Sequence, residues 1–327
     1  MLKQAYSGKD CSLYSIADGK KTEIDRFIAT TQETRQICND PFTVGVKYTR
    51  KLENACTHVF KALKEINCFT PKEEDTIVFN VLRGGLNFGL REALANAYGW
   101  NTHGSAFISA QRARVSHNSE QWHITESHYK KVYVPREAVV VLGDVVATGT
   151  SLQHAMNELV KSVKENRAQL TTLVFFTIGG RRSEGIVHAI DMKCRELFPK
   201  YEKSIIIYFE GRFEVANPKT ELFIKITGTD LLRLNSLMAP EFIESQYESP
   251  SYAIERCTIY DAGSRAFWLP EYFEDLKEYW EGVLALAQNG TCYTELLKNR
   301  FSKLDVARFG DVDLAEVAGK QLDKVAL

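Results

Sequence analysis

The chain has 327 residues, of which 44% are hydrophobic and 25% are charged, and its formal net charge is −1. These values are typical of a globular protein with a large core, and they exclude wholesale disorder. The balance of 41 basic and 42 acidic residues gives no general attraction for polyanions, so binding of nucleic acid would require a local patch.

Seven cysteines are spread along the chain without CxxC spacing. An odd, unpatterned set favours reduced thiols over a disulfide framework, so we expect a cytoplasmic protein. The first residues contain no apolar run of signal-peptide length, and no segment approaches the roughly 18 apolar residues of a membrane span. The sequence therefore predicts no membrane partner.

Residues 22–68 are predicted to be mainly helical. Thr22 is a candidate helix cap, and Ile24 and Phe27 follow at the spacing of a core face. Apolar residues then recur every three or four positions, which indicates an amphipathic helix. These residues are Tyr48, Leu52, Ala55, Val59, Leu63 and Ile66. We expect residues 1–70 to form a helical N-terminal extension.

From Asp75 onward, short apolar segments alternate with helical ones. The apolar segments are rich in β-branched and aromatic residues, which predicts buried strands. The predicted strands are residues 76–82, 103–110, 139–142, 169–179 and 204–211. Helices are predicted over residues 86–99, 152–166 and 184–198. This alternation predicts an α/β fold with a doubly wound parallel sheet in residues 71–212, where ligands bind beyond the carboxyl ends of the strands.

Beyond the fifth strand the sequence is less regular. Residues 221–226 and 252–261 are predicted as strands, and residues 270–288 as a helix with proline in its first turn. The last thirty or so residues are polar and have a helical pattern. We expect residues 213–327 to form an α+β accessory region.

The segment VVVLGDVVATGTSL, residues 139–152, combines a buried strand with a turn of small and hydroxylated residues. Gly149 would let the backbone approach an oxyanion, and the N-terminus of the next helix would face it. Asp144, at the end of the strand, can accept hydrogen bonds from sugar hydroxyls. On composition alone, a phosphate site and an ordinary capped helix explain the turn equally well.

Together with VLRGGLNFG, residues 81–89, this segment resembles the two motifs with which type I phosphoribosyltransferases bind phosphoribosyl diphosphate (PRPP). The resemblance covers roughly residues 70–210, and RGGL is most similar to the xanthine–guanine branch. It implies a type I phosphoribosyltransferase-like sheet with a C-terminal hood, in a transferase of nucleotide metabolism. Such a glycosyltransferase moves the phosphoribosyl group of PRPP to a nucleobase or other acceptor and releases diphosphate.

The resemblance also implies which residues bind PRPP. Arg83, Gly84 and Gly85 would bind the diphosphate, and Asp144 would contact the ribose hydroxyls and, through water, a Mg²⁺ ion that arrives with PRPP. The 5′-phosphate would be held by Thr148, Gly149, Thr150 and Ser151, and Ala147 would belong to the same PRPP-binding loop. The catalytic residues would be Asp144 and Arg83, because neutralisation of the leaving diphosphate would dominate catalysis.

Two positions depart from the family pattern. The first acidic position of the PRPP motif is Gly143, so one charged hydrogen bond to the ribose, worth about 1.5–3 kcal/mol, would be lost. Ala147 stands where 6-oxopurine enzymes carry an aspartate near the base, as it does in adenine-type relatives.

Residues 111–131 occupy the place of the family's mobile active-site loop. Arg112, Arg114 and Lys130 are candidates to cover the diphosphate, although a polar surface loop explains the segment equally well. Trp122 could stack on a base or pack at a subunit interface. We expect a homo-oligomer.

Recognition of the base is expected between residues 252 and 268. The candidates are the aromatic residues Tyr252, Tyr260, Phe267 and Trp268 and the polar residues Arg256 and Asp261. An ordinary hydrophobic core also explains these aromatic residues.

Two other classes of function remain open. A non-catalytic regulator or defence-system effector with this fold would bind PRPP or a nucleotide, and nucleic acid through the basic residues 112–131. Gly143 and the terminal extensions favour this alternative. A Rossmann-like oxidoreductase or nucleotide hydrolase would need a GxGxxG or GxxxxGK[ST] fingerprint, and the sequence has neither.

Overall fold

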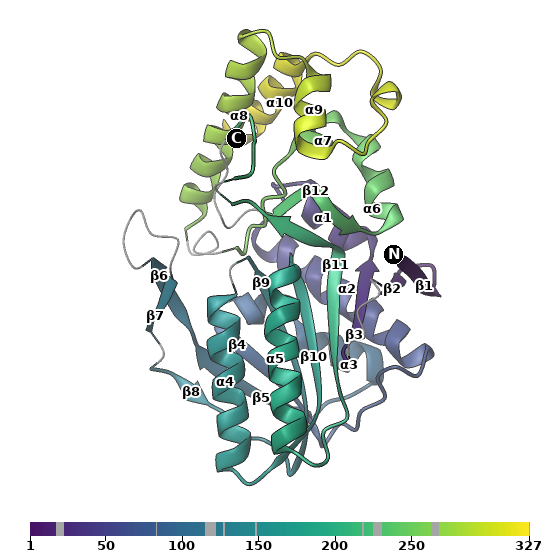
Figure 1. Ribbon diagram of the computed structural model, residues 1–327, viewed down its shortest axis with the longest axis vertical. Helices are drawn as coiled ribbons and strands as arrows, with labels where there is room; N and C mark the ends of the chain where they lie inside the picture. Colours follow the sequence, from purple (N-terminus) through teal and green to yellow (C-terminus); the bar gives the residue numbers. More distant parts are fainter. Residues whose placement is uncertain are drawn as a thin grey trace.

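The computed structural model shows a large sheet flanked by helices, with a group of C-terminal helices above it (Figure 1). It describes residues 1–17, 23–82, 84–114, 122–126, 128–147, 149–217, 219–224, 231–262 and 268–326. Among the helices of these residues, none combines the length and the hydrophobicity that crossing a bilayer requires.

Ten of the described strands form one sheet in the order β1-β2-β3-β11-β10-β9-β4-β5-β8, with β12 beside β11. Its six central strands run parallel. In spatial order they are β3 (Asp25–Thr30), β11 (Lys203–Val215), β10 (Gln169–Gly180), β9 (Glu137–Val146), β4 (Thr76–Leu82) and β5 (Gly104–Ser109). The antiparallel strands are β1 (Leu2–Ser7), β2 (Ser12–Ile16), β8 (Lys130–Lys131) and β12 (Leu231–Met238). The expected α/β fold with a mostly parallel sheet is confirmed.

Helices cover both faces of the sheet, as expected for a doubly wound arrangement (Figure 1). One face carries α4 (Thr150–Glu165) and α5 (Arg181–Leu197), and the other carries α2 (Gly45–Glu65) and α3 (Leu90–Tyr98). The remaining helices are α1 (Gln32–Asn39), α6 (Pro240–Ser245), α7 (Pro250–Ile254), α8 (Leu269–Gln288), α9 (Tyr293–Phe301) and α10 (Leu314–Ala326). The described residues also include the short 3-10 helices η1 (Gly84–Phe88), η2 (Gln246–Glu248) and η4 (Val306–Phe309).

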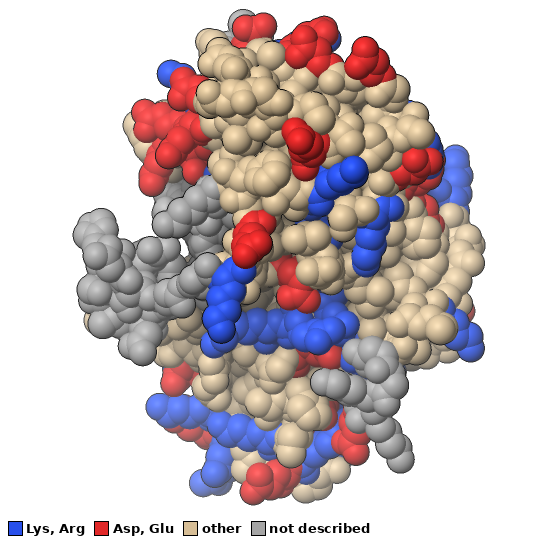
Figure 2. All heavy atoms as spheres, turned by 45° about the horizontal axis from the view of Figure 1, so that its top comes forward, with Lys and Arg blue, Asp and Glu red and all other residues tan. Residues whose placement is uncertain are grey.

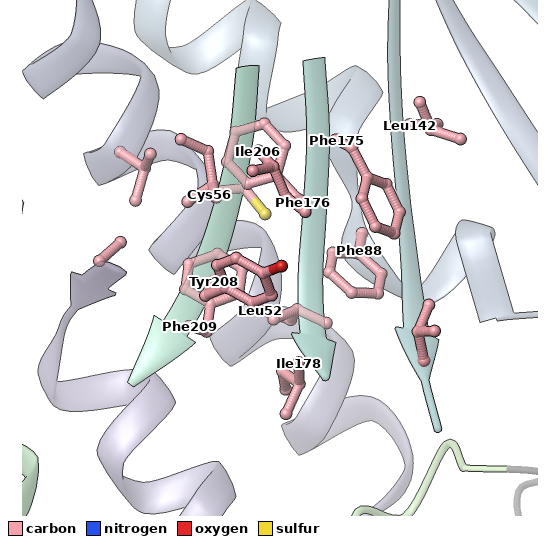
Figure 3. Close-up of a cluster of buried hydrophobic side chains, with 14 of the residues drawn as sticks. Leu52, Cys56, Phe88, Leu142, Phe175, Phe176, Ile178, Ile206, Tyr208 and Phe209 are labelled. Carbon is pink, nitrogen blue, oxygen red and sulfur yellow. The ribbon is translucent and has the colours of Figure 1, made fainter. Parts of the chain in front are cut away.

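Aromatic rings fill the core where α2 and η1 meet the central strands (Figure 3). The rings of Phe60 and Phe176 meet edge to face at 4.9 Å, and those of Phe88 and Phe209 stack at 6.5 Å. The stripe predicted for α2 is confirmed, because all but the last of its residues are buried. This packing holds η1 against β9, next to the candidate site.

The helical interpretation of the first residues of the 22–68 segment is wrong. Residues 25–30 form β3, which pairs in parallel with β11, and β1 and β2 extend the sheet beyond it. Both faces of β3 are covered, so its sequence lacks the alternation of a half-buried strand. Arg26 also hid the strand, because a charged residue argues against a buried segment. Its burial is compensated by Glu184 of α5, which accepts a hydrogen bond from Nη1 of Arg26 at 2.7 Å.

The strands predicted in the C-terminal region are also wrong. Residues 250–254 form α7, which begins at a proline, and residues 255–262 are irregular. Residues 221–224 form no strand: the N–H of Phe223 and the carbonyl of Glu221 form hydrogen bonds with the side chain of Asn299. Residues 225–226 lie outside the described residues. The sequence missed β12, whereas α8 confirms the helix predicted over residues 270–288.

Buried polar contacts fix the C-terminal helices over the sheet. Arg233 donates from Nη2 to the carbonyl of Cys38 at 3.0 Å, and Gln246 donates to Oδ1 of Asn39 at 2.7 Å. The hydroxyl of Tyr272 donates to the carbonyl of Pro41 at 2.6 Å. These bonds connect the C-terminal region to α1 and its flanking loop. The predicted domain boundaries near residues 70 and 212 stay predictions.

Candidate functional site

The turn between β9 and α4 presents backbone N–H groups at the start of a long helix. Gly149 is the N-cap of α4 and has a left-handed backbone, with a φ of 78°. A Cβ atom at this position would overlap Cδ1 of Ile186. Since glycine has no side-chain acceptor and no described side chain caps the helix, its first N–H groups are available to an anion.

The other residues predicted to hold a phosphate surround this helix start. Ala147 is buried, and Thr150 and Ser151 lie half-buried in the first turn of α4. Thr148 lies outside the described residues. The binding of phosphate by these residues stays a prediction.

The loop after β4 packs against β9. A Cβ atom on Gly85 would lie 3.3 Å from the carbonyl oxygen of Gly143, so the loop backbone packs directly on β9. A Cβ atom on Gly84 would lie 3.0 Å from Oδ1 of Asp144. Two candidate residues, Gly84 and Asp144, are therefore brought together, while Arg83 lies outside the described residues.

A second carboxylate approaches the same glycine. Oδ2 of Asp261 lies 3.2 Å from the place of a Gly84 Cβ atom, and the Asp261 residue is only 4% exposed. We call Asp144 and Asp261 the carboxylate pair. The sequence had suggested Asp261 only as a reader of the base, because nothing in the local pattern of residues 252–261 indicates contact with the β4 loop.

The segment that carries Asp261 is held by its own turn. The Glu255 side chain accepts hydrogen bonds from the backbone N–H groups of Cys257 and Thr258, and the N–H of Ala262 donates to the carbonyl of Ile259 at 3.0 Å. Burial raises the pKa of Glu255, although Arg233 and Arg256 oppose this. The turn fixes the backbone on both sides of Asp261.

Tyr48 of α2 carries a buried hydroxyl group, and its ring packs edge to face at 5.4 Å on that of Tyr260, the neighbour of Asp261 in the chain. The residue is 0% exposed, and its hydroxyl has no hydrogen-bond partner in the part of the chain that the structure describes. Burial raises the pKa of Tyr48 well above its ordinary value, and the charges of Asp261 and Asp144 raise it further. The hydroxyl therefore stays protonated and can act as a donor.

The first acidic position of the PRPP motif is closed by packing. A Cβ atom on Gly143 would lie 2.5 Å from Cγ of Phe88, whose ring is fully buried. No carboxylate side chain fits there unless Phe88 moves. The motif itself therefore supplies only one carboxylate, Asp144.

A pair of arginines beside the β9–α4 turn escaped the sequence analysis. Arg181 and Arg182 are exposed in the first turn of α5, and Cγ of Arg182 lies 3.8 Å from the place of a Gly149 Cβ atom. Cations at a helix N-terminus are unfavourable unless an anion compensates them. The signal was the RR pair after the fourth strand, but that helix was predicted to begin only at Glu184. In the view of Figure 2, Lys and Arg side chains form a band across the middle of the molecule, with Asp and Glu among and above them.

The loop candidates lie to one side of this arrangement. Arg112 and Arg114 belong to β6 (Gln111–Arg114), which pairs with β7 (Trp122–Glu126) in a separate hairpin next to α4 (Figure 1). Lys130 forms an ion pair with Glu158 of α4 at 3.0 Å. The role of these residues over a diphosphate stays a prediction.

The remaining candidates for base recognition have different surroundings. Arg256 is buried, donates to Oγ1 of Thr258 at 2.7 Å and pairs with Asp275 at 2.6 Å, so it stabilises the C-terminal region. Tyr260 packs edge to face on Tyr48 at 5.4 Å. Tyr252 is half-buried, Trp268 is 63% exposed, and Phe267 lies outside the described residues.

Carboxylate oxygens such as those of Asp144 and Asp261 are of the ligand type that Mg²⁺ prefers, and this ion usually keeps several water or substrate oxygens. Within the described residues, no group of three or more His, Cys, Asp or Glu side chains could hold a metal ion by itself. The binding of Mg²⁺ that arrives with PRPP stays a prediction.

No family model and no curated protein matches this sequence. Three solved structures illustrate the similarities in fold. A hypoxanthine phosphoribosyltransferase from Staphylococcus aureus is 14% identical over 40% of this chain and 64% of that chain, with a TM-score of 0.27. A hypoxanthine-guanine phosphoribosyltransferase from Bacillus anthracis is 18% identical over 40% and 69%, with a TM-score of 0.26. The Trypanosoma cruzi hypoxanthine phosphoribosyltransferase with the product IMP is 15% identical over 45% and 67%, with a TM-score of 0.24.

This chain thus spans less than two thirds of the first of these proteins. TM-scores this low carry no argument about the site, which rests on the contacts of its own residues.

Proposed function

We propose that this protein binds PRPP with Mg²⁺ and transfers its phosphoribosyl group to a nucleobase or another acceptor, releasing diphosphate. The observation that supports this most is the meeting of the two motifs at Gly84, where the β4 loop lies against Asp144. The N-terminus of α4 opens at the carboxyl end of the same strand, β9. A phosphate site and a diphosphate site at one sheet edge match the two ends of PRPP.

The 5′-phosphate would lie at the β9–α4 turn. Backbone N–H groups after Gly149 and the hydroxyls of Thr150 and Ser151 are suitable donors, and Thr148 and Ala147 complete the proposed loop. Arg182 would add a positive charge from α5. The diphosphate would lie on Gly84 and Gly85, with Arg83 as its cationic partner.

The reaction would break the bond between C1 of the ribose and a diphosphate oxygen, with the electron pair leaving on the diphosphate. A nitrogen of the acceptor would form the new bond to C1. Mg²⁺, held by ligand oxygens and through water by Asp144, would neutralise charge on the leaving group. Arg83 would do the same, and Asp144 would orient the ribose through a hydroxyl. Because Ala147 provides no carboxylate beside the base, proton removal from the acceptor would not depend on that position.

Calorimetric titration of PRPP with and without MgCl₂ tests the binding, and a panel of bases with detection of diphosphate tests the transfer. We expect PRPP binding that strengthens with Mg²⁺ and diphosphate release with one acceptor. Asp144→Asn should weaken PRPP binding about 10- to 100-fold, as expected for loss of a charged hydrogen bond. The surface variant Asp311→Asn is the matched control, since Asp311 is exposed at a distance in sequence from every candidate.

Turnover at the wild-type rate in a variant that combines Asp144→Asn with Arg83→Ala would rule out this site. A cytoplasmic location and a homo-oligomeric state stay predictions.

The second candidate function is a non-catalytic regulator or effector that binds PRPP or a nucleotide. The closure of Gly143 by Phe88 favours it, because the motif then lacks the first of its two acids. Its mark would be calorimetric binding of PRPP without turnover of any base in the panel. Nucleic acid that copurifies with the wild type, but is lost when Arg112 and Arg114 are changed to alanine, would extend this candidate to nucleic-acid binding.

A further inference from the structure

The edge of the sheet that ends in β8 carries two exposed tyrosines. Tyr129 is 51% exposed and Tyr133 is 67% exposed. β8 is the last strand at the end of the sheet opposite β1 (Figure 1). Exposed apolar side chains that are scattered singly need no explanation, whereas rings that gather at one place mark a candidate interaction surface.

The backbone at this edge is held by the sheet. β8 pairs with β5, where Lys131 lies opposite Phe107. The N–H of Ser109 donates to the carbonyl of Tyr129 at 2.9 Å, and the N–H of Tyr129 donates to the hydroxyl of Ser109 at 3.0 Å. A ligand would therefore meet side chains on a fixed backbone, which limits the entropy that is lost on binding.

Alternation places the two tyrosines and one lysine on the outer side of this edge. Val132 and Val134 pack partly buried against the hydrophobic core, whereas Tyr129, Lys131 and Tyr133 are exposed. Residues two apart in an extended chain point to the same side, and four residues span about 13 Å. Nζ of Lys131 lies 5.2 Å from the centre of the Tyr133 ring. We call these three exposed residues the tyrosine strip.

The carboxylates beside the tyrosine strip are paired with other lysines. Glu158 of α4 pairs with Lys130 at 3.0 Å, and Glu137, which follows the strip in the chain, pairs with Lys200. Lys131, by contrast, forms no ion pair within the described residues. Its charge is therefore available to an anion that reaches the strip.

We propose that the tyrosine strip binds single-stranded nucleic acid. Proteins bind single strands by stacking bases on aromatic side chains and placing phosphates beside cations. Tyr129 and Tyr133 each stack on a base, and Lys131 between them contacts a phosphate. This surface is separate from the PRPP candidates, and it places nucleic acid on the sheet edge instead of on Arg112 and Arg114.

Fluorescence anisotropy with a labelled oligo(dT) strand of about 20 nucleotides tests the proposal. The wild type should bind this strand more tightly than a duplex of the same length, whose bases are already stacked inside. Tyr129→Ala and Tyr133→Ala should each weaken binding about 5- to 20-fold. Tyr133→Phe should bind like the wild type, because its ring still stacks. The exposed positions of both tyrosines should leave the melting temperature of these variants unchanged.

The contribution of charge is measured by the dependence on salt. Between about 50 and 200 mM NaCl, Lys131→Ala should reduce the slope of log affinity against log salt by about 0.7, the value for one phosphate of a single strand. Phe223→Ala is the control for an exposed ring, since Phe223 is 52% exposed and bonded to Asn299 of α9. Lys3→Ala, on β1 at the other end of the sheet, is the control for charge. Both controls should bind the strand like the wild type.

Several results would overturn the proposal. A folded wild type that does not bind the dT strand is one, and equal affinity for strand and duplex is another, because it would show a contact with phosphates alone. Full binding by the double variant Tyr129→Ala and Tyr133→Ala would place the nucleic acid elsewhere. Binding of phosphatidylglycerol vesicles in place of the strand would assign the surface to a membrane. None of these results bears on the titration of PRPP, so the two proposals fail separately.

Discussion

The β9–α4 turn and the carboxylate pair lie at the same edge of the sheet, but the chain builds them in different ways. The turn is continuous: a strand, a left-handed glycine and a helix start follow one another within residues 137–152. The carboxylate pair joins β9, the β4 loop and a segment of the C-terminal region. A local element is specified by its own residues, whereas the pair depends on every contact that positions the C-terminal region.

This difference implies different sensitivities. Changes at the turn should act through backbone geometry close to the substitution. Changes at the carboxylate pair should act through packing and through the connection between distant segments. Four predictions test this contrast.

The largest effect is expected when the missing acid is restored. Gly143→Asp would place a side chain 2.5 Å from Phe88 and bury a carboxylate, so we expect a loss of about 3–5 kcal/mol in the free energy of unfolding. Denaturant unfolding measures this loss. Phe88→Ala opens this space. In the Phe88→Ala background, Gly143→Asp should therefore lower the free energy of unfolding much less than it does in the wild type. Full additivity of the two changes would contradict the packing explanation.

A smaller effect on the free energy of unfolding is expected when the pH changes the protonation of Glu210, which connects α1 to the sheet. Glu210, at the end of β11, accepts hydrogen bonds from Thr30 at 2.7 Å, from the N–H of Thr31 at 3.1 Å and from the hydroxyl of Thr34. Burial raises the pKa of Glu210 to about 7 from its ordinary 4.5, although these donors oppose it. The folded state therefore holds a proton that the unfolded chain releases.

The sign follows from this raised pKa. The stabilisation is fully present below about pH 4.5 and is lost as the pH rises through about 7, so the free energy of unfolding should fall by roughly 3 kcal/mol across this window. Glu210→Gln, which resembles the protonated acid, should remove this part of the pH dependence. Unfolding curves at several pH values measure the difference between the two proteins, and parallel curves would contradict the raised pKa.

The sequence predicted the local elements best. The strand before the β9–α4 turn, the helix after it and the amphipathic stripe of α2 all carry their signal within a few residues. It failed at β3, where a buried Arg26 and apolar residues at helical spacing hid a strand covered on both faces. It failed again at residues 252–261, where a proline starts a short helix.

The two parts of the site follow the same rule. The approach of Gly84 to Asp144 could be predicted from the sequence, because neighbouring parallel strands bring their carboxyl ends together. The place of Asp261 could not, since it depends on how the segment after α7 folds back over Gly84. The closure of Gly143 by Phe88 is equally non-local, because it requires the position of η1 against β9.

A test of the local element is Gly149→Ala. The left-handed backbone costs alanine about 1–2 kcal/mol, and the overlap with Ile186 adds about 1 kcal/mol or more. Gly99→Ala is a matched control, because Gly99 has a φ of 75° but a Cβ atom there would have no described neighbour within 4 Å. Thermal or denaturant unfolding should show the larger loss for Gly149→Ala. Equal losses would mean that Ile186 moves aside without cost.

The smallest effect is expected at Arg182, and it separates charge from backbone geometry at the β9–α4 turn. Arg182→Ala should weaken the binding of inorganic phosphate about 3- to 10-fold, because one partly exposed charge near an anion contributes about 1 kcal/mol. The loss should shrink as salt is raised, since salt screens exposed charges. Arg167→Ala, at the other end of α4, is the control and should have no effect on binding. If Arg182→Ala binds phosphate like the wild type at low salt, the site depends on the backbone of the turn alone, and the arginine pair of α5 has no part in it.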